Sequence, residues 1–211
     1  MESARENILA RLKAAQDKRG EIGTNVPDFT SPVYHELDPV LSNEFKKNLE
    51  SIGGQVVVAH SKSEVISEVK RICDEKNQTR IFCTDAKLQE LLKETVEIDS
   101  EETYFNGLNI GVTGCEFLVA HLGSVLISSA QISGRRLNVF PETHIVIANQ
   151  AQLTDYLDRA IEKLQIKYKN NLPSLISNIT GPSRTADIEK TLVMGMHGPK
   201  SLIVILSDEL I

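Results

Sequence analysis

The sequence predicts an α/β fold with a parallel-rich sheet flanked by helices and with an N-terminal helical extension. Short apolar, β-branched runs such as residues 55–59 and 202–206 are typical of strands that are buried on both faces. Amphipathic helices separate several of these runs, and this alternation favours a parallel sheet with right-handed crossovers. A composition of 41% hydrophobic and 25% charged residues is typical of a globular chain with a buried core.

The N-terminal extension is predicted from one amphipathic pattern. Residues 3–18 place apolar side chains on a single helical face, at Ile8, Leu9 and Leu12. The pattern ends near Gly20, and a stretch without clear periodicity follows. We therefore expect residues 1–40 to form a helical extension and residues 41–211 to form the main domain.

In the main domain, the pattern predicts strands and helices in turn. Strands are expected at residues 55–59, 80–83, 109–112, 124–128, 145–148 and 202–206. Helices are expected at residues 42–52, 63–72, 85–94 and 153–167. Residues 113–120 fit either a short helix or a strand.

Composition excludes several classes of function. The net charge of −6 opposes binding to duplex nucleic acid or to an anionic membrane surface. No apolar run approaches the roughly 20 residues that span a bilayer, and the charged N-terminus is unlike a secretory signal, so we expect a cytoplasmic protein. The three cysteines form no CxxC pair, and no histidines show HExxH or HxH spacing. We therefore expect no metal site and no cofactor held by this chain alone.

The first candidate site lies in residues 179–190. Gly181 and the following proline force a turn. Ser183 and Thr185 supply hydroxyls, and Arg184 supplies a planar cation that matches a carboxylate or a phosphate. A helix starting at residue 185 would add free N–H groups to such an anion site. The alternative is a structural turn in which Ser183 or Thr185 caps that helix.

A second candidate, His197, follows within the same C-terminal region. Gly198 and a proline flank this histidine and fix its turn, which suits a general base or a polar ligand contact. The alternative is an ordinary hydrogen-bonded loop histidine.

The third candidate region is residues 111–144. Glu116 lies within an apolar stretch, so it is either an acid, base or nucleophile facing a cavity, or a buried ion pair with an arginine. His121 lies five residues further on, and Gly123 and Ser124 are candidates for backbone contacts with a ligand. His144 enters a predicted strand, where it is a ligand contact or a core-edge histidine.

These segments resemble a known family. The stretch NITGPSRTADIEKTLVMGMHGPKSLIVIL at residues 178–206 resembles the signature of the LUD-domain family, in its LutC (YkgG-like) branch. The stretches GVTGCEFLVAHLGSVLIS and PETHIVIAN, at residues 111–128 and 141–149, match a second block of that family. The resemblance covers about the C-terminal half of the chain.

The resemblance implies a fold like that of the NagB, RpiA and CoA-transferase group. It also implies a role in oxidising L-lactate to pyruvate beside two iron–sulfur partner subunits, LutA and LutB, which would hold the clusters. One departure stands out: many relatives read A-[DE]-T-G-T where this chain has Ala120, His121, Leu122, Gly123 and Ser124. The role of that family carboxylate therefore does not carry over to His121.

Three functions remain open from the sequence. In the first, the chain is a lactate-oxidation subunit in which Arg184 binds a small carboxylate and His197 accepts the hydroxyl proton. In the second, it is a non-catalytic scaffold or regulatory subunit. In the third, it is a free-standing enzyme acting on a sugar phosphate or an acyl-CoA, with Glu116 as base or nucleophile.

Overall fold

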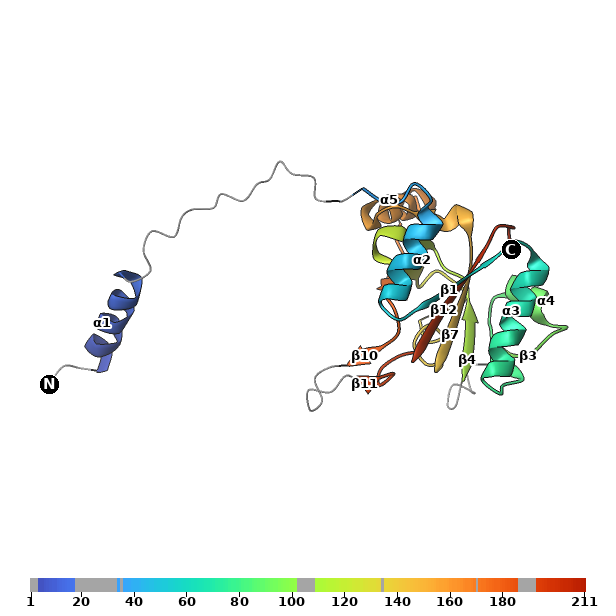
Figure 1. Ribbon diagram of the computed structural model, residues 1–211, viewed down its shortest axis with the longest axis horizontal. Helices are drawn as coiled ribbons and strands as arrows, with labels where there is room; N and C mark the ends of the chain where they lie inside the picture. The colour runs from blue at the N-terminus through green and yellow to red at the C-terminus, as the bar shows by residue number, and fades with distance from the viewer. Residues whose placement is uncertain are drawn as a thin grey trace. The chain divides into compact units, whose positions relative to one another are not determined.

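A six-stranded parallel sheet forms the centre of the computed structural model (Figure 1). The strand order is β1-β12-β7-β4-β2-β3, and every neighbouring pair runs parallel. The strands are β1 (Gln55–Ala59), β12 (Ser201–Ser207), β7 (Thr143–Asn149), β4 (Ile110–Thr113), β2 (Arg80–Phe82) and β3 (Glu97–Asp99). The sheet confirms the predicted α/β class with its parallel-rich architecture.

The structure describes residues 4–17, 34, 36–101, 109–133, 135–169, 171–185 and 193–211. The chain divides into two compact units, Met1–Glu36 and Leu37–Ile211. In the first unit, α1 (Ala4–Asp17) is the expected amphipathic helix, and its apolar residues Ile8, Leu9 and Leu12 are exposed. None of the described helices combines the length and the apolar character needed to cross a bilayer.

One face of the large sheet is covered by α3 (Lys62–Glu75) and α4 (Ala86–Leu92). The apolar residues of α3 recur at helical spacing, and they pack on alternate residues of the strands, such as Ile145 and Ile203. The helices begin at capping residues, since Ser61 accepts a hydrogen bond from Glu64 N and Asp85 accepts one from Lys87 N.

The opposite face is covered by α2 (Leu41–Ser51) and by a second sheet of four strands in the order β8-β5-β6-β9. These strands are β8 (Leu153–Thr154), β5 (Phe117–Val119), β6 (Ser124–Ser128) and β9 (Ile176–Ile179). Helix α5 (Leu157–Lys167) packs on the outer face of this small sheet through Ala160 and Leu164. A short antiparallel hairpin follows, made of β10 (Arg184–Thr185) and β11 (Val193–Met194).

Several predicted elements differ from the observed ones. The helix predicted at residues 153–167 begins only at Leu157, because Leu153 pairs with Leu118 as part of β8. Of the ambiguous residues 113–120, Thr113 ends β4, Phe117–Val119 form β5 and Ala120 begins the 3-10 helix η2 (Ala120–Leu122). A helix does not begin at residue 185, since Thr185 is extended and paired with Val193; residues 186–192 lie outside the described part of the chain.

Candidate functional site

A cavity of about 490 Å³ lies at the carboxyl ends of β2, β4 and β7. Its walls come from the start of α4 (residues 85–88), the turn after β4 (residues 114–115), the end of β7 and the residues after it (147–149, 151 and 152), Gln131 and Ile132, Lys167, and residues 210–211. In parallel α/β sheets, ligands bind in the crevice outside the carboxyl ends of the strands. Position and size make this cavity the candidate functional site.

Two amide side chains fix the walls of the cavity. Nε2 of Gln152 donates to the carbonyl oxygen of Cys115 at 2.7 Å, and Oε1 of Gln152 accepts from the backbone N–H of Asn149 at 2.8 Å. Nδ2 of Asn149 donates to the carbonyl oxygen of Ser207 at 3.2 Å. These bonds link the turns after β4, β7 and β12, so the end of the sheet is held in one arrangement.

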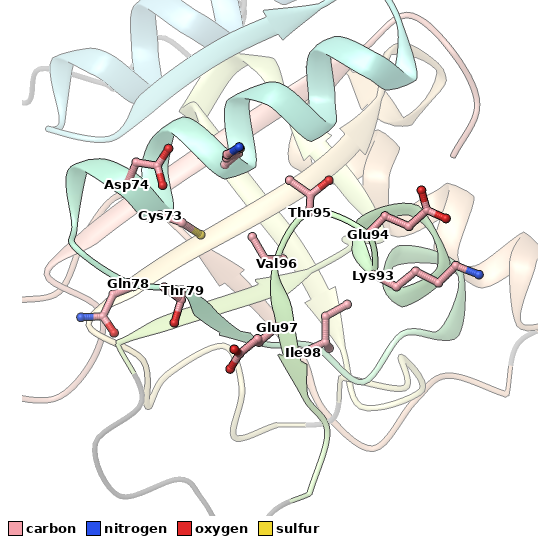
Figure 2. A pocket seen from close by; sticks show the side chains of 11 residues that line it. Cys73, Asp74, Gln78, Thr79, Lys93, Glu94, Thr95, Val96, Glu97 and Ile98 are labelled. Carbon is pink, nitrogen blue, oxygen red and sulfur yellow. The ribbon is translucent and has the colours of Figure 1, made fainter.

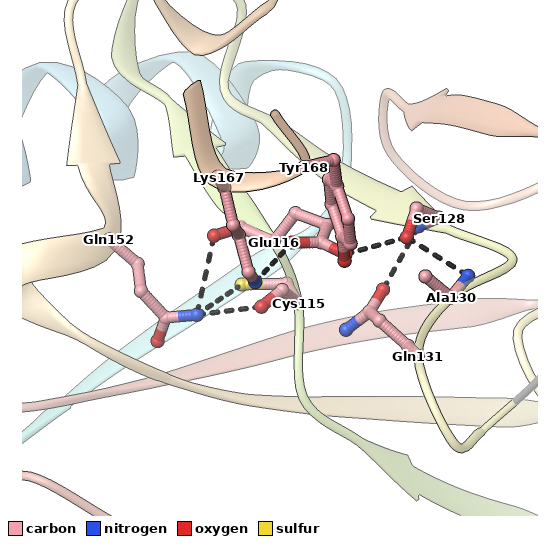
Figure 3. Close-up of polar contacts among 8 residues, drawn as sticks. All are labelled: Cys115, Glu116, Ser128, Ala130, Gln131, Gln152, Lys167 and Tyr168. Atoms are coloured by element: carbon pink, nitrogen blue, oxygen red, sulfur yellow. Dashed lines mark hydrogen bonds and ion pairs between the residues drawn. The ribbon is translucent and has the colours of Figure 1, made fainter. Parts of the chain in front are cut away.

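A buried carboxylate, that of Glu116, lies beside the cavity, and its side chain has no exposed area. It accepts hydrogen bonds from Oγ of Ser128 at 2.6 Å, from the hydroxyl of Tyr168 at 2.7 Å and from Nζ of Lys167 at 2.7 Å (Figure 3). Glu116 follows β4, Ser128 ends β6, and the other two residues stand at the end of α5. The end of α5, about 50 residues later in the chain, thus meets the β5–β6 hairpin at one carboxylate.

These contacts keep both partners of the ion pair charged. Burial alone would raise the pKa of Glu116, but the hydrogen bonds from Lys167, Ser128 and Tyr168 outweigh it and lower that pKa. Burial likewise opposes the charge of Lys167, but its hydrogen bond to Glu116 raises the pKa of the ammonium group. Because the lysine side chain is 53% exposed and lines the cavity, a fixed cation faces that space.

This geometry assigns Glu116 a positioning role. Its side chain is fully covered and bonded to three donors. In this arrangement the carboxylate holds the ammonium group of Lys167 in place. The expectation of a buried ion pair was right in kind, but the partner is a lysine and not the arginine that was predicted.

The described residues of the predicted site at residues 179–190 lie toward the other end of the parallel strands. Arg184 is exposed, and its guanidinium lies over Gly53, just before β1, where a Cβ on that glycine would be 2.6 Å from Nη2. Ser183 lies against Gly198 and donates its backbone N–H to the carbonyl oxygen of Pro199. The structure therefore does not bring Arg184 and Glu116 together, since Arg184 is at the amino end of β1 and Glu116 follows the carboxyl end of β4.

His197 is also exposed, beside the same hairpin. Thr185 continues the hairpin by pairing with Val193. The candidate region at residues 111–144 does meet the C-terminal family block at residues 178–206, because β9 pairs with β6. The glycines beside these strands allow close packing against α2 and the residue that follows it. A Cβ on Gly123 (φ +59°) would lie 2.2 Å from the backbone nitrogen of Leu49, and one on Gly181 (φ +80°) would lie 3.1 Å from the carbonyl oxygen of Ile52.

The remaining candidates lie in structural positions. His121 is on η2, with its ring centroid 5.2 Å from that of Tyr156. Ser124 is buried, and its hydroxyl has no hydrogen-bond partner among the described residues. His144 is buried in β7, with Nε2 2.8 Å from Oγ1 of Thr113. Among the predicted site residues, Glu116 contacts Lys167, which lines the candidate cavity.

A larger cavity, of about 700 Å³, lies between α3 and β3 (Figure 2). Its charged side chains are of both signs, among them Lys70, Asp74, Lys93 and Glu97. Burial raises the pKa of the Cys73 thiol at its wall to about 11, so this sulfur is not a reactive thiolate at neutral pH.

The described part of the chain holds no group of three or more His, Cys, Asp or Glu side chains that could bind a metal ion.

Fold and site together define an α/β protein with a candidate ligand cavity at the carboxyl end of a parallel sheet. The LUD domain family model matches residues 42–207, and the chain belongs to this family. A DUF162 family protein from Deinococcus radiodurans shares the fold, with a TM-score of 0.61, 16% identity and coverage of 79% of this chain and 96% of the other.

Curated relatives extend the comparison. Lactate utilization protein C of Bacillus subtilis (strain 168) is 36% identical over 103 residues, which are 47% of this chain and 43% of the relative. The chain thus matches less than half the length of that protein. Lactate utilization protein C 1 of Bacillus mycoides (strain KBAB4) is 27% identical over 78% of this chain and 71% of its own length. An uncharacterized protein of Neisseria meningitidis serogroup B is 26% identical over 96% and 93% of the two chains.

Sequence reasoning missed most of the residues that build the cavity. Lys167 was visible only as the end of an amphipathic helix, and nothing in the sequence pairs it with a carboxylate 51 positions earlier. Gln152 and Asn149 form a capping box around the short 3-10 helix η3 (Gln150–Gln152), and that pattern was the one local signal available.

Proposed function

We propose that this chain acts in lactate utilization, as a subunit that binds a small 2-hydroxy or 2-oxo acid in the carboxyl-edge cavity while partner subunits oxidise L-lactate to pyruvate. One observation carries the proposal: the Lys167 ammonium is held by the buried Glu116 at the wall of a cavity outside the carboxyl ends of parallel strands. A cation fixed in this way pairs with the carboxylate of such an acid.

The names of the curated relatives support this substrate class, since several are called lactate utilization protein C. The oxidation itself needs an electron acceptor. Within the described residues no set of metal-binding side chains gathers, and burial raises the pKa of all three cysteine thiols. We therefore assign the iron–sulfur clusters to partner subunits in the cytoplasm and the binding of the acid to this chain.

The proposal is tested by binding to the purified full chain. Isothermal titration with L-lactate and with pyruvate is expected to give one site, and Lys167→Met is expected to weaken it at least tenfold because the fixed cation is removed. Lys163→Met is the matched control, since Lys163 is an exposed lysine one turn earlier on the same helix that does not line the cavity.

A second control separates this site from the one predicted from sequence. Arg184→Ala is expected to leave the affinity for both acids unchanged, because Arg184 lies at the opposite edge of the sheet. Loss of binding in Arg184→Ala with full binding in Lys167→Met would refute the carboxyl-edge site.

A further inference from the structure

The cavity is much larger than a three-carbon acid. A water molecule accounts for about 30 Å³ of liquid volume, and lactate is only a few times that size. The cavity measures about 490 Å³, within the range of sites for larger organic ligands. If a lactate carboxylate binds at Lys167, most of the cavity stays filled with water.

Away from Lys167, apolar side chains line the cavity beside the charged Asp85 and Lys87 and the amide of Gln131. Ile132 lies near the turn after β2, since its carbonyl oxygen accepts a hydrogen bond from Oγ1 of Thr84 at 3.3 Å. Ile211 lies on the same side, where it packs against the core cluster that includes Leu88 of α4. Lys167 lies by contrast on the side of Cys115 and Glu116, after β4.

Two of the apolar lining residues are exposed to an unusual degree. Ile132 is 70% exposed and Leu210 is 75% exposed, although both border a cavity. Covering such side chains with an aliphatic group removes apolar surface from water on both partners, at about 25 cal/mol per Å². A ligand whose carboxylate contacts Lys167 and whose aliphatic tail covers this surface would use both parts of the cavity.

We propose that the site takes 2-hydroxy or 2-oxo acids with an aliphatic side chain of four or more carbons, and binds them more tightly than lactate. The inference rests on the proposed function, because it assigns the acid group to Lys167. Ile132 is then a specificity-determining residue that contacts the end of the tail.

The test is a titration series with L-lactate, 2-hydroxybutyrate and 2-hydroxyhexanoate on the full chain. Each added methylene that becomes buried contributes about 0.8 kcal/mol, so the affinity is expected to rise up to about fourfold per carbon. Ile132→Ser is expected to reduce this rise while leaving the affinity for lactate unchanged. Val139→Ser is the control, since Val139 is also an exposed apolar residue but does not line the cavity.

The outcomes separate the two proposals. Binding of lactate that depends on Lys167, with no gain along the series, overturns the inference and leaves the proposed function standing. A gain along the series that Ile132→Ser does not reduce also overturns it. Absence of binding for every acid, or binding that Lys167→Met does not weaken, overturns the proposed function and the inference with it.

Discussion

Acidification is expected to destabilise the domain through His144. This side chain is fully buried in β7, where Nε2 contacts Thr113 and Nδ1 has no hydrogen-bond partner among the described residues. Burial lowers the pKa of His144 to about 4, from an ordinary value of 6.5. In the unfolded chain the imidazole is exposed and takes up a proton at the ordinary value.

The sign of the effect follows from proton binding. Between about pH 6.5 and pH 4 the unfolded chain binds one more proton at this position than the folded chain, so the free energy of unfolding falls as the pH falls. Above about pH 6.5 His144 is neutral in both states, and its contribution to the free energy of unfolding is fully present. At pH 4.5 the loss is about 2.5 kcal/mol, since one pKa unit corresponds to about 1.4 kcal/mol.

The measurement is chemical denaturation of the wild type and of His144→Gln at pH 7.5 and pH 4.5. Glutamine keeps a hydrogen-bonding group near Thr113 but does not titrate. The carboxylates of the chain titrate in both proteins, so their effect cancels in the difference. We expect the wild type to lose about 2.5 kcal/mol more than the variant between the two pH values. Equal losses would show that His144 is not held neutral by burial.

Two further substitutions test the packing and the ion pair. Gly123→Ala is expected to cost roughly 3 kcal/mol or more of unfolding free energy, because its φ is +59° and the new Cβ would fall 2.2 Å from the backbone of Leu49. Gly114→Ala is the control and should change stability little, since its Cβ would come no closer than 4.0 Å to other atoms; a similar loss in both would contradict the packing argument. Glu116→Gln is expected to cost about 2 kcal/mol at pH 7, because an amide replaces an acceptor of three hydrogen bonds. As the pKa of Glu116 is lowered below 4.5, that cost should be present above pH 4.5 and shrink as the pH falls through the folded value; a cost independent of pH in thermal denaturation would contradict it.

The sequence predicted the large sheet better than the small one. Strands buried on both faces, such as β7 and β12, are nearly continuous apolar runs, and they stand out from the amphipathic helices around them. The small sheet contains β8, which has two residues, and β9, of which no residue is fully buried, so neither carries a periodic signal. Pairing with β5 and β6 makes them strands, and such long-range pairing is invisible to local patterns.

The candidate site shows the same limit in its chemistry. Glu116 was recognisable because a carboxylate in an apolar stretch needs a compensating partner. Its role depended on which side chains the fold brings to it, and Ser128, Lys167 and Tyr168 come from two other elements. Arg184 shows the converse: its residue type suits a carboxylate, but its hairpin places the guanidinium over Gly53 at the amino end of the strands. Residue type alone does not say at which end of the sheet a cation lies, and the fold places Lys167, not Arg184, beside the cavity at the carboxyl ends, where ligands of parallel α/β sheets bind.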